Sequence, residues 1–153
     1  MRSRKPIFGP FSLALRCALS ALLLIGGLPA MASGKFINLV PKTKSEVQLI
    51  LNTLEAGISD DRTDQPAIVM MLHGREAERF LRHSYPSNKM LIDQTAKLSA
   101  YRVIDVQICE AWMRKNDYSK DDLFPFISTV PFAPAELKRL EDKEGYTEYD
   151  VDL

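Results

Sequence analysis

The residue best suited to nucleophilic chemistry in this chain is Cys109, the single cysteine after residue 32. The β-branched segment 102–108 predicts a strand that ends beside it, and residues 110–115 predict a short helix directly after it. A thiol at a helix start lies near unpaired backbone N–H groups, whose partial positive charge stabilises the nucleophilic thiolate. The spacing therefore suits sulfur chemistry, and burial as a small apolar side chain is the structural alternative.

His73 and Gly74 form a second candidate site, because they follow the continuous apolar run 67–72, which predicts a buried strand. A histidine at the carboxyl end of a strand can hydrogen-bond to a thiolate or donate a proton to a persulfide. The alternative is a loop histidine whose hydrogen bonds are satisfied locally. His73 is therefore a catalytic candidate and Gly74 a binding candidate.

Trp112 and Arg114 follow Cys109 by three and five residues and complete the set of binding candidates. Arg114 offers a cation to an anionic sulfur species, and an exposed arginine without a ligand is the alternative. Trp112 suits a core or subunit-contact position as well as a ligand platform. The two histidines and Cys109 lack the spacing of zinc ligands, and no glycine-rich phosphate loop occurs, so we expect no metal site and no cofactor.

The elements that must position these residues alternate between strands and helices. Strands are predicted at 36–40, 67–72, 102–108, 127–132 and 146–151. Helices are predicted from Ser45 (with Gln48 as capping-box partner) to Gly57, at 76–82, 88–98 and 110–115, as a turn at 121–122, and from Pro134 to Gly145. This order predicts an α/β three-layer sandwich with a mostly parallel sheet of about five strands and flavodoxin-type winding. Such sheets bind ligands outside the carboxyl ends of their strands.

An export signal is predicted over residues 1–32. It has a basic start without acidic residues, an uncharged run over 17–28, and small residues where a signal peptidase cleaves, near Ala32 and Ser33. The uncharged run has 12 residues, whereas a bilayer-spanning helix needs about 20. We therefore expect a periplasmic or secreted single domain over 33–153 without a stable membrane span, and a retained anchor is the alternative.

The charge balance argues against nucleic acid as a partner. The chain has 20 basic and 20 acidic side chains, and residues 1–32 hold four of the basic ones and none of the acidic ones. The domain over 33–153 is therefore mildly acidic and has no basic stripe. Three arginines cluster between 75 and 82, but Glu76 and Glu78 are interleaved with them, so we interpret this segment as a solvated face.

The stretch 106–116, Val-Gln-Ile-Cys-Glu-Ala-Trp-Met-Arg-Lys-Asn, resembles the cysteine motif of the DsrE/DsrF-like family. Order and spacing elsewhere agree, with Leu72-His73-Gly74 after the second strand, Thr129-Val130-Pro131, and a terminal helix over 137–146. The resemblance covers about residues 36–149. It implies an α/β fold, homo-oligomers such as trimers or hexamers, and a persulfide-carrying cysteine, which by position is Cys109.

Two functions are compatible with these observations. In the first, an exported DsrE-like sulfur carrier accepts sulfane sulfur on Cys109 as a persulfide and passes it to a partner protein. In the second, a non-catalytic homo-oligomeric module binds a small ligand or a partner and buries its cysteine. An unpaired cysteine in an exported protein indicates a reactive thiol, an intermolecular disulfide or burial, and the sequence leaves these three open.

Overall fold

The computed structural model describes residues 33–40, 42–58 and 65–149, so the predicted signal over 1–32 lies outside the described residues. The strands are β1 (Lys35–Asn38), β2 (Ile68–Leu72), β3 (Ile104–Cys109), β4 (Ile127–Val130) and β5 (Thr147–Glu148). The α-helices are α1 (Lys44–Ala56), α2 (Tyr85–Ala100), α3 (Glu110–Lys115) and α4 (Ala133–Glu144). Short 3-10 helices are η2 (Arg75–Phe80), η3 (Arg82–Ser84) and η4 (Lys120–Asp122).

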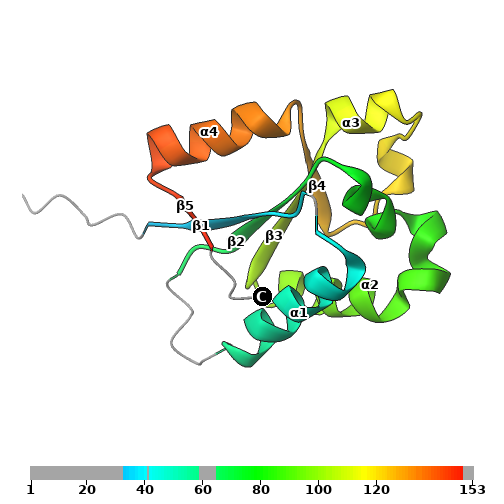
Figure 1. The fold of residues 1–153 in the computed structure, drawn as a ribbon, viewed down its shortest axis with the longest axis horizontal. Coiled ribbons are helices and arrows are strands. Elements are labelled where there is room, and N and C mark those ends of the chain that lie inside the picture. Colours follow the sequence, from blue (N-terminus) through cyan, green and yellow to red (C-terminus); the bar gives the residue numbers. More distant parts are fainter. Residues whose placement is uncertain (1–32, 41, 59–64, 150–153) are drawn as a thin grey trace, which may run out of the picture. The chain divides into compact units, whose positions relative to one another are not determined.

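The five strands form one parallel sheet in the order β4-β3-β2-β1-β5. Helices α1 and α2 pack on one face of the sheet and α4 covers the other (Figure 1). The predicted α/β sandwich of three layers with a five-stranded parallel sheet is therefore confirmed. The strand order differs from the flavodoxin order, 2-1-3-4-5. Here the chain moves in one direction through four strands and reverses only after β4, when α4 carries it back to β5 beside β1.

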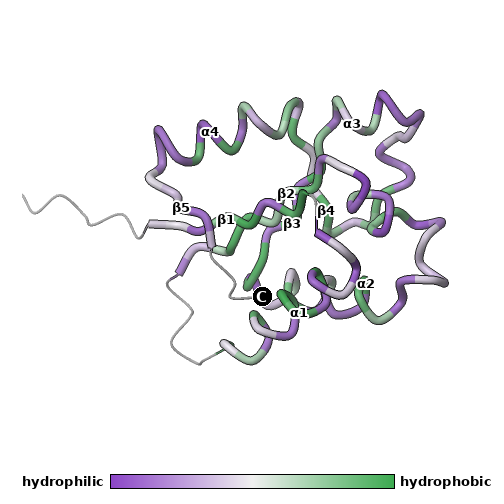
Figure 2. Tube along the Cα trace, viewed as in Figure 1, coloured by the Kyte–Doolittle hydropathy of each residue, from purple (hydrophilic) through white to green (hydrophobic). Residues whose placement is uncertain are grey.

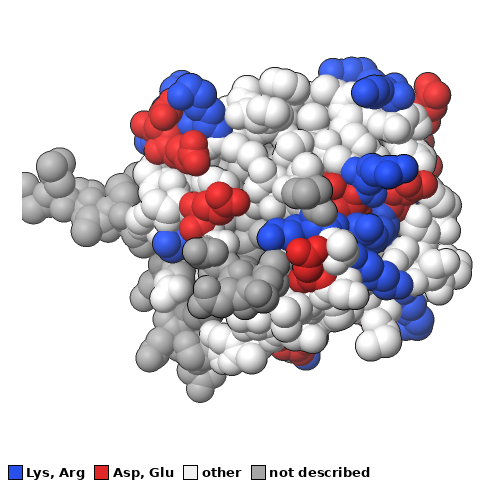
Figure 3. Space-filling view, viewed as in Figure 1, with Lys and Arg blue, Asp and Glu red and all other residues white. Residues whose placement is uncertain are grey.

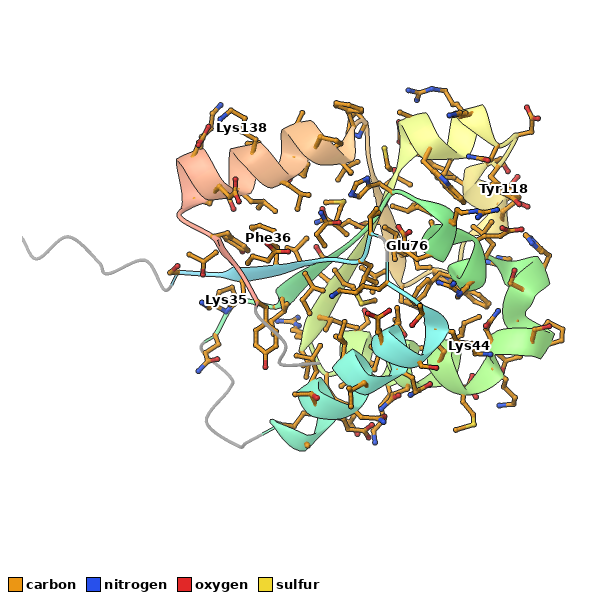
Figure 4. All side chains as sticks on the ribbon, in the orientation of Figure 1. Lys35, Phe36, Lys44, Glu76, Tyr118 and Lys138 are labelled. Carbon is orange, nitrogen blue, oxygen red and sulfur yellow. The ribbon has the colours of Figure 1, made fainter. Side chains whose placement is uncertain are left out.

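Alternation along the strands builds two hydrophobic cores of unequal size. Strand side chains that point to one face of the sheet, such as Met70 and Val106, join α1 and α2 in a core with 22 buried residues among those described. Strand side chains that point to the opposite face, such as Phe36, join α4 in a core with seven buried residues among those described. Figure 2 shows hydrophobic residues concentrated in the central strands, and Figure 4 shows Phe36 on the α4 side of β1. The face under α4 is therefore the less protected one.

Helix α1 begins two residues earlier than the sequence predicted. Thr43, not Ser45, is the N-cap, and Glu46 takes the place assigned to Gln48. The Thr43 hydroxyl accepts the Glu46 N–H, and the Glu46 carboxylate accepts the Thr43 N–H at 2.6 Å. Both pairs have the capping-box spacing, and the ionised carboxylate makes the stronger hydrogen bond. The predicted end of the helix at Gly57 is confirmed.

The helix predicted over 76–82 is present as two short 3-10 helices, η2 and η3, with a break at Leu81. Ala77 and Phe80 are both fully buried, and their three-residue spacing matches the three residues per turn of a 3-10 helix. Helix α2 starts at Tyr85 rather than at Asn88, which remains as a non-helical residue inside it. Pro86 therefore lies in the first turn of α2, where its missing N–H is harmless.

Candidate functional site

Cys109 is the last residue of β3, and its side chain faces α4. Val106 and Ile108 of the same strand point to the other face and belong to the core under α1 and α2, whereas Cys109 belongs to the core under α4. The next residue, Glu110, begins α3, so Cys109 occupies the N-cap of that helix. The predicted strand–cysteine–helix arrangement is therefore confirmed.

The Cys109 thiol contacts the start of a different helix from the one predicted. It makes no side-chain cap bond to α3; instead its Sγ accepts the backbone N–H of Ala133, the first residue of α4, at 3.4 Å. The first N–H groups of a helix have no partner within the helix, so the sulfur satisfies one of them. Cys109 thus lies at the N-terminal ends of two helices, α3 and α4.

This position is also the point at which the sheet reverses its winding. Cys109 pairs in register with Val130, so β3 and β4 end side by side. The connection after β3 begins with α3, whose Trp112 contacts both cores, and leads to the adjacent β4, whereas the connection after β4 forms α4 and runs back in the opposite direction to β5 (Figure 1). Open α/β sheets bind ligands where neighbouring connections leave in opposite directions. The thiol is nevertheless buried, since Cys109 is only 3% exposed.

His73 follows β2 on the same edge of the sheet, but the hydrogen bond of its side chain leads away from Cys109. Its Nε2 lies 3.0 Å from Oδ1 of Asn38 in β1, on the far side of β2 from β3. In register, Leu72 lies opposite Ile108, so His73 and Cys109 occupy the next positions of adjacent strands. The structure therefore brings the two residues to one edge and holds the imidazole toward β1.

The loop at Gly74 is occupied by a buried carboxylate, Glu76, which the sequence reasoning interpreted as solvated. Glu76 is 2% exposed, and its Oε1 accepts the backbone N–H groups of His73 and Gly74 at 2.9 and 2.6 Å. Figure 4 shows Glu76 close to the ends of the strands. Successive backbone N–H groups of this kind commonly bind anions. An internal anion already fills the position, so these amides are not open to a ligand.

Trp112 is half-buried and packs against both cores. Its ring stacks on Tyr118 with 5.5 Å between centroids, and Tyr118 stacks on His83 at 5.7 Å. Burial and the nearby Glu78 carboxylate raise the pKa of Tyr118. Trp112 therefore holds α3 in place as a packing residue. This aromatic stack was missed because His83 is far from Trp112 and Tyr118 in the sequence.

Arg114 is exposed and lies beside Glu110, with 3.7 Å between Nη1 and Oε2, rather than beside the thiol. Glu110 is a residue that the sequence reasoning missed. Its Oε1 accepts the Thr129 hydroxyl of β4 at 2.8 Å and lies 3.1 Å from Lys120 Nζ. The Thr129 hydroxyl, Lys120 and the positive charge of Arg114 lower the pKa of Glu110. Glu110 thus joins α3 to β4 and η4 immediately beside Cys109.

A small cavity of about 250 Å³ opens next to this carboxylate. Its lining residues are Glu110, Met113, Arg114, Tyr118, Ser119 and Lys120. Both signs of charge are present, and the two cations are paired with Glu110. The cavity therefore has no strong preference for an anion.

The described ranges contain no group of three or more His, Cys, Asp or Glu side chains placed to hold a metal ion. Among the described helices, none combines the length and the apolar character that crossing a bilayer requires.

Comparison with known proteins supports the fold and gives no information on the function. No family model matches the chain, and no curated protein matches it significantly. A solved structure of a protein of unknown function, MTH1491 from Methanobacterium thermoautotrophicum, is similar with a TM-score of 0.59 and 16% sequence identity. The match covers 76% of this chain and 96% of that one. At this identity the similarity shows a shared α/β fold alone.

Proposed function

We propose that this chain is an exported sulfur carrier of the DsrE/DsrF-like type, with Cys109 as the residue that holds the sulfur. The observation that carries the proposal is the position of Sγ, which accepts the first N–H of α4 at the reversal of the sheet. The sulfur therefore has a backbone donor from an element that leaves over the α4 face. The resemblance around Cys109 supports the proposed family, and the signal-like segment 1–32 supports the proposed export.

The proposed chemistry transfers one neutral sulfur atom and needs no external oxidant. The Cys109 thiolate attacks the sulfane sulfur of thiosulfate, the sulfur–sulfur bond of thiosulfate breaks, and sulfite leaves with the bonding electron pair. The product is a Cys109 persulfide anion, so the total charge is unchanged. A partner thiolate then attacks the outer sulfur, which regenerates the Cys109 thiolate and forms a persulfide on the partner.

Burial of the thiol sets a condition on this chemistry. A persulfide places its outer sulfur about 2 Å beyond Sγ, so the core around the 3% exposed Cys109 must open to admit a second sulfur. Phe132, which directly precedes α4, is 54% exposed beside the site. An exposed aromatic residue suits a subunit contact, and we include a homo-oligomer in the proposal.

Intact mass spectrometry tests the proposal directly. The full chain carries Cys17→Ser, so that Cys109 is the only cysteine, and is exposed to thiosulfate or polysulfide. We expect a gain of about 32 Da, one sulfur atom, that dithiothreitol removes and that the added Cys109→Ser substitution abolishes. Absence of the adduct, together with a thiol that iodoacetamide alkylates only after unfolding, would overturn the proposal.

One observation favours the second function, a non-catalytic binding module. Cys109 is 3% exposed, as expected of a small core side chain. In that case Cys109→Ala leaves the binding properties unchanged and the wild-type chain gains no sulfur. The same mass measurement therefore separates the two functions.

A further inference from the structure

Five cationic side chains surround the loops that follow β1 and β2 at the carboxyl edge of the sheet. We call them the basic rim: Lys42, Lys44, Arg75, Arg79 and Arg82. Figure 3 shows Lys and Arg side chains gathered on this side of the visible face, with a few acidic side chains among them. Within the described residues none of the five forms an ion pair, whereas cations elsewhere do, for example Lys97 with Glu55.

The acidic residues interleaved with the rim arginines are engaged elsewhere. Glu76 points inward and accepts the N–H groups of the His73–Gly74 loop. Glu78 lies beside the Tyr118 hydroxyl. Glu46 also faces the rim, and the charge of Lys42 helps to lower its pKa. The segment is therefore not the balanced solvated face that the sequence suggested, and the rim keeps an excess of positive charge.

Three of the rim side chains are held in place by single hydrogen bonds. Arg79 Nη1 donates to Lys42 O at 3.3 Å, and Lys44 Nζ donates to Ser87 O at 2.7 Å. Arg82 Nε donates to Leu123 O at 2.6 Å, and its guanidinium lies over the Phe124 ring, 5.6 Å from the centroid.

A guanidinium has five N–H donors, so Arg79 and Arg82 keep most of theirs for a ligand. Cations that are already ordered lose less conformational entropy when they bind an anionic partner.

We propose that the basic rim is the docking surface for an acidic face of a partner protein, which exchanges sulfur with Cys109. This inference rests on the proposed function. The cations come from separate segments, so they match an extended acidic surface better than one small anion. The rim and Cys109 both lie at the carboxyl ends of the strands, so a protein docked on the rim also covers the edge of the sheet at which Cys109 lies. Its thiolate then takes the outer sulfur of the Cys109 persulfide, and the Cys109 thiolate leaves.

Binding of a fluorescein-labelled polyglutamate peptide to the full chain, followed by anisotropy, tests the rim without any sulfur chemistry. We expect binding that weakens as sodium chloride is added. The double variant Lys42→Glu/Arg75→Glu should bind about tenfold more weakly or worse. Neither side chain makes a hydrogen bond among the described residues, so the fold should survive, which circular dichroism checks.

The matched control is Lys138→Glu/Lys143→Glu, which makes the same change of charge on α4, where Figure 4 places Lys138 away from the rim. Equal loss of binding in both double variants would overturn the docking site. So would rim-dependent binding to phosphatidylglycerol vesicles without binding to the peptide, because the partner would then be a membrane surface.

Sulfur transfer provides the second readout. A persulfide on Cys109 is offered to a cysteine in a polyglutamate peptide and to a cysteine in a Gly-Ser peptide. We expect faster transfer to the acidic peptide at low salt and equal rates in Lys42→Glu/Arg75→Glu. If the persulfide forms but the peptides react equally, the docking inference fails and the proposed function stands. If no persulfide forms, the proposed function fails, and the anisotropy measurement still decides whether the rim binds acidic surfaces.

Discussion

The environment of Cys109 depends on the backbone of an element far away in the sequence. The thiol meets the first N–H of α4, 24 residues later, and not an N–H of the helix that it begins. The residues on either side of Cys109 were sufficient to predict the end of a strand and the start of a helix. They could not predict Ala133 as the donor, because that contact requires β4 to lie beside β3 and α4 to leave over the opposite face.

Gly74 illustrates a residue whose side chain must be absent. A Cβ there would lie 2.6 Å from Glu76 Oε2 and 2.9 Å from Val40 Cγ2. Gly74→Ala should therefore destabilise the protein by about 1–3 kcal/mol, because the carboxylate that must shift is buried and accepts the His73 and Gly74 N–H groups. Urea unfolding followed by circular dichroism measures the loss. Since the loop carries His73, we also expect the His73 ring resonances to shift.

Gly57→Ala is the matched control for this substitution. A Cβ at Gly57 meets backbone oxygens at 3.5 and 3.7 Å, which are ordinary contacts, and its φ of −85° suits alanine. Its effect on the free energy of unfolding should stay within about 0.5 kcal/mol. Comparable losses in the two variants would show that the Glu76 carboxylate does not fill the space beside Gly74.

The sequence assigned Glu76 to a solvated face for an understandable reason. Glutamate is rarely buried, and alternation with three arginines is typical of exposed helices. The structure buries it because two backbone N–H groups at the end of β2 compensate its charge. Such compensation depends on the loop conformation, so no local pattern of residue types could identify it.

At the scale of elements, Glu110 joins three of them next to the thiol. The Thr129 hydroxyl and Lys120 lower the pKa of its carboxyl in the folded state. A carboxyl whose folded pKa is depressed stabilises the fold above its ordinary pKa, about 4.3, and loses that contribution as the pH falls through the folded value. The wild-type protein should therefore lose stability in acid partly through Glu110.

Glu110→Gln tests this contribution. At about pH 7 the variant should unfold at a lower urea concentration than the wild type, because the amide carries no charge. Below about pH 4 the difference between the two midpoints should shrink, since protonation removes the charge from the wild type as well. Glu141→Gln, on an α4 side chain without an ion pair in the described part of the chain, is the control. A pH-independent difference would contradict the role of the charge.

The sequence predicted the type of the helices and strands better than it predicted where they end. The inward residues of α1, Val47, Ile50, Leu51 and Leu54, are all buried as the periodicity predicts. The predicted strand over 127–132 ends at Val130 because the chain must turn before Ala133 to begin α4. Gly145 ends α4 in the left-handed region, with φ of 68°, as its position at the end of the apolar pattern predicted. Ends depend on tertiary contacts that periodicity does not contain.

At the scale of the whole described domain, the two faces of the sheet are unequally protected. The core formed with α1 and α2 contains 22 buried residues among those described, whereas the core formed mainly with α4 contains seven, which include Cys109. In the thiol's own strand, two residues before Cys109, Gln107 Oε1 is buried and has no partner within the described residues. Local opening free energies are lowest where few apolar contacts hold an element. Helix α4 should therefore open before the rest of the domain, and its opening exposes the thiol.

Leu140→Ala tests whether α4 controls access to Cys109. Leu140 is 3% exposed in the core that contains Cys109, so its truncation should weaken the docking of α4 by about 2–5 kcal/mol. In a Cys17→Ser background, alkylation of Cys109 by iodoacetamide in the folded protein should then accelerate about thirtyfold or more, because the population with α4 open rises as the free energy of docking is lost.

Leu51→Ala is the control, because it removes a similar side chain from the large core and lowers the midpoint of unfolding without loosening α4. Alkylation should change little in that variant as long as global unfolding remains rare. Equal acceleration in both would mean that the thiol is reached only through global unfolding, and a persulfide on Cys109 would then have no route to a partner in the folded protein.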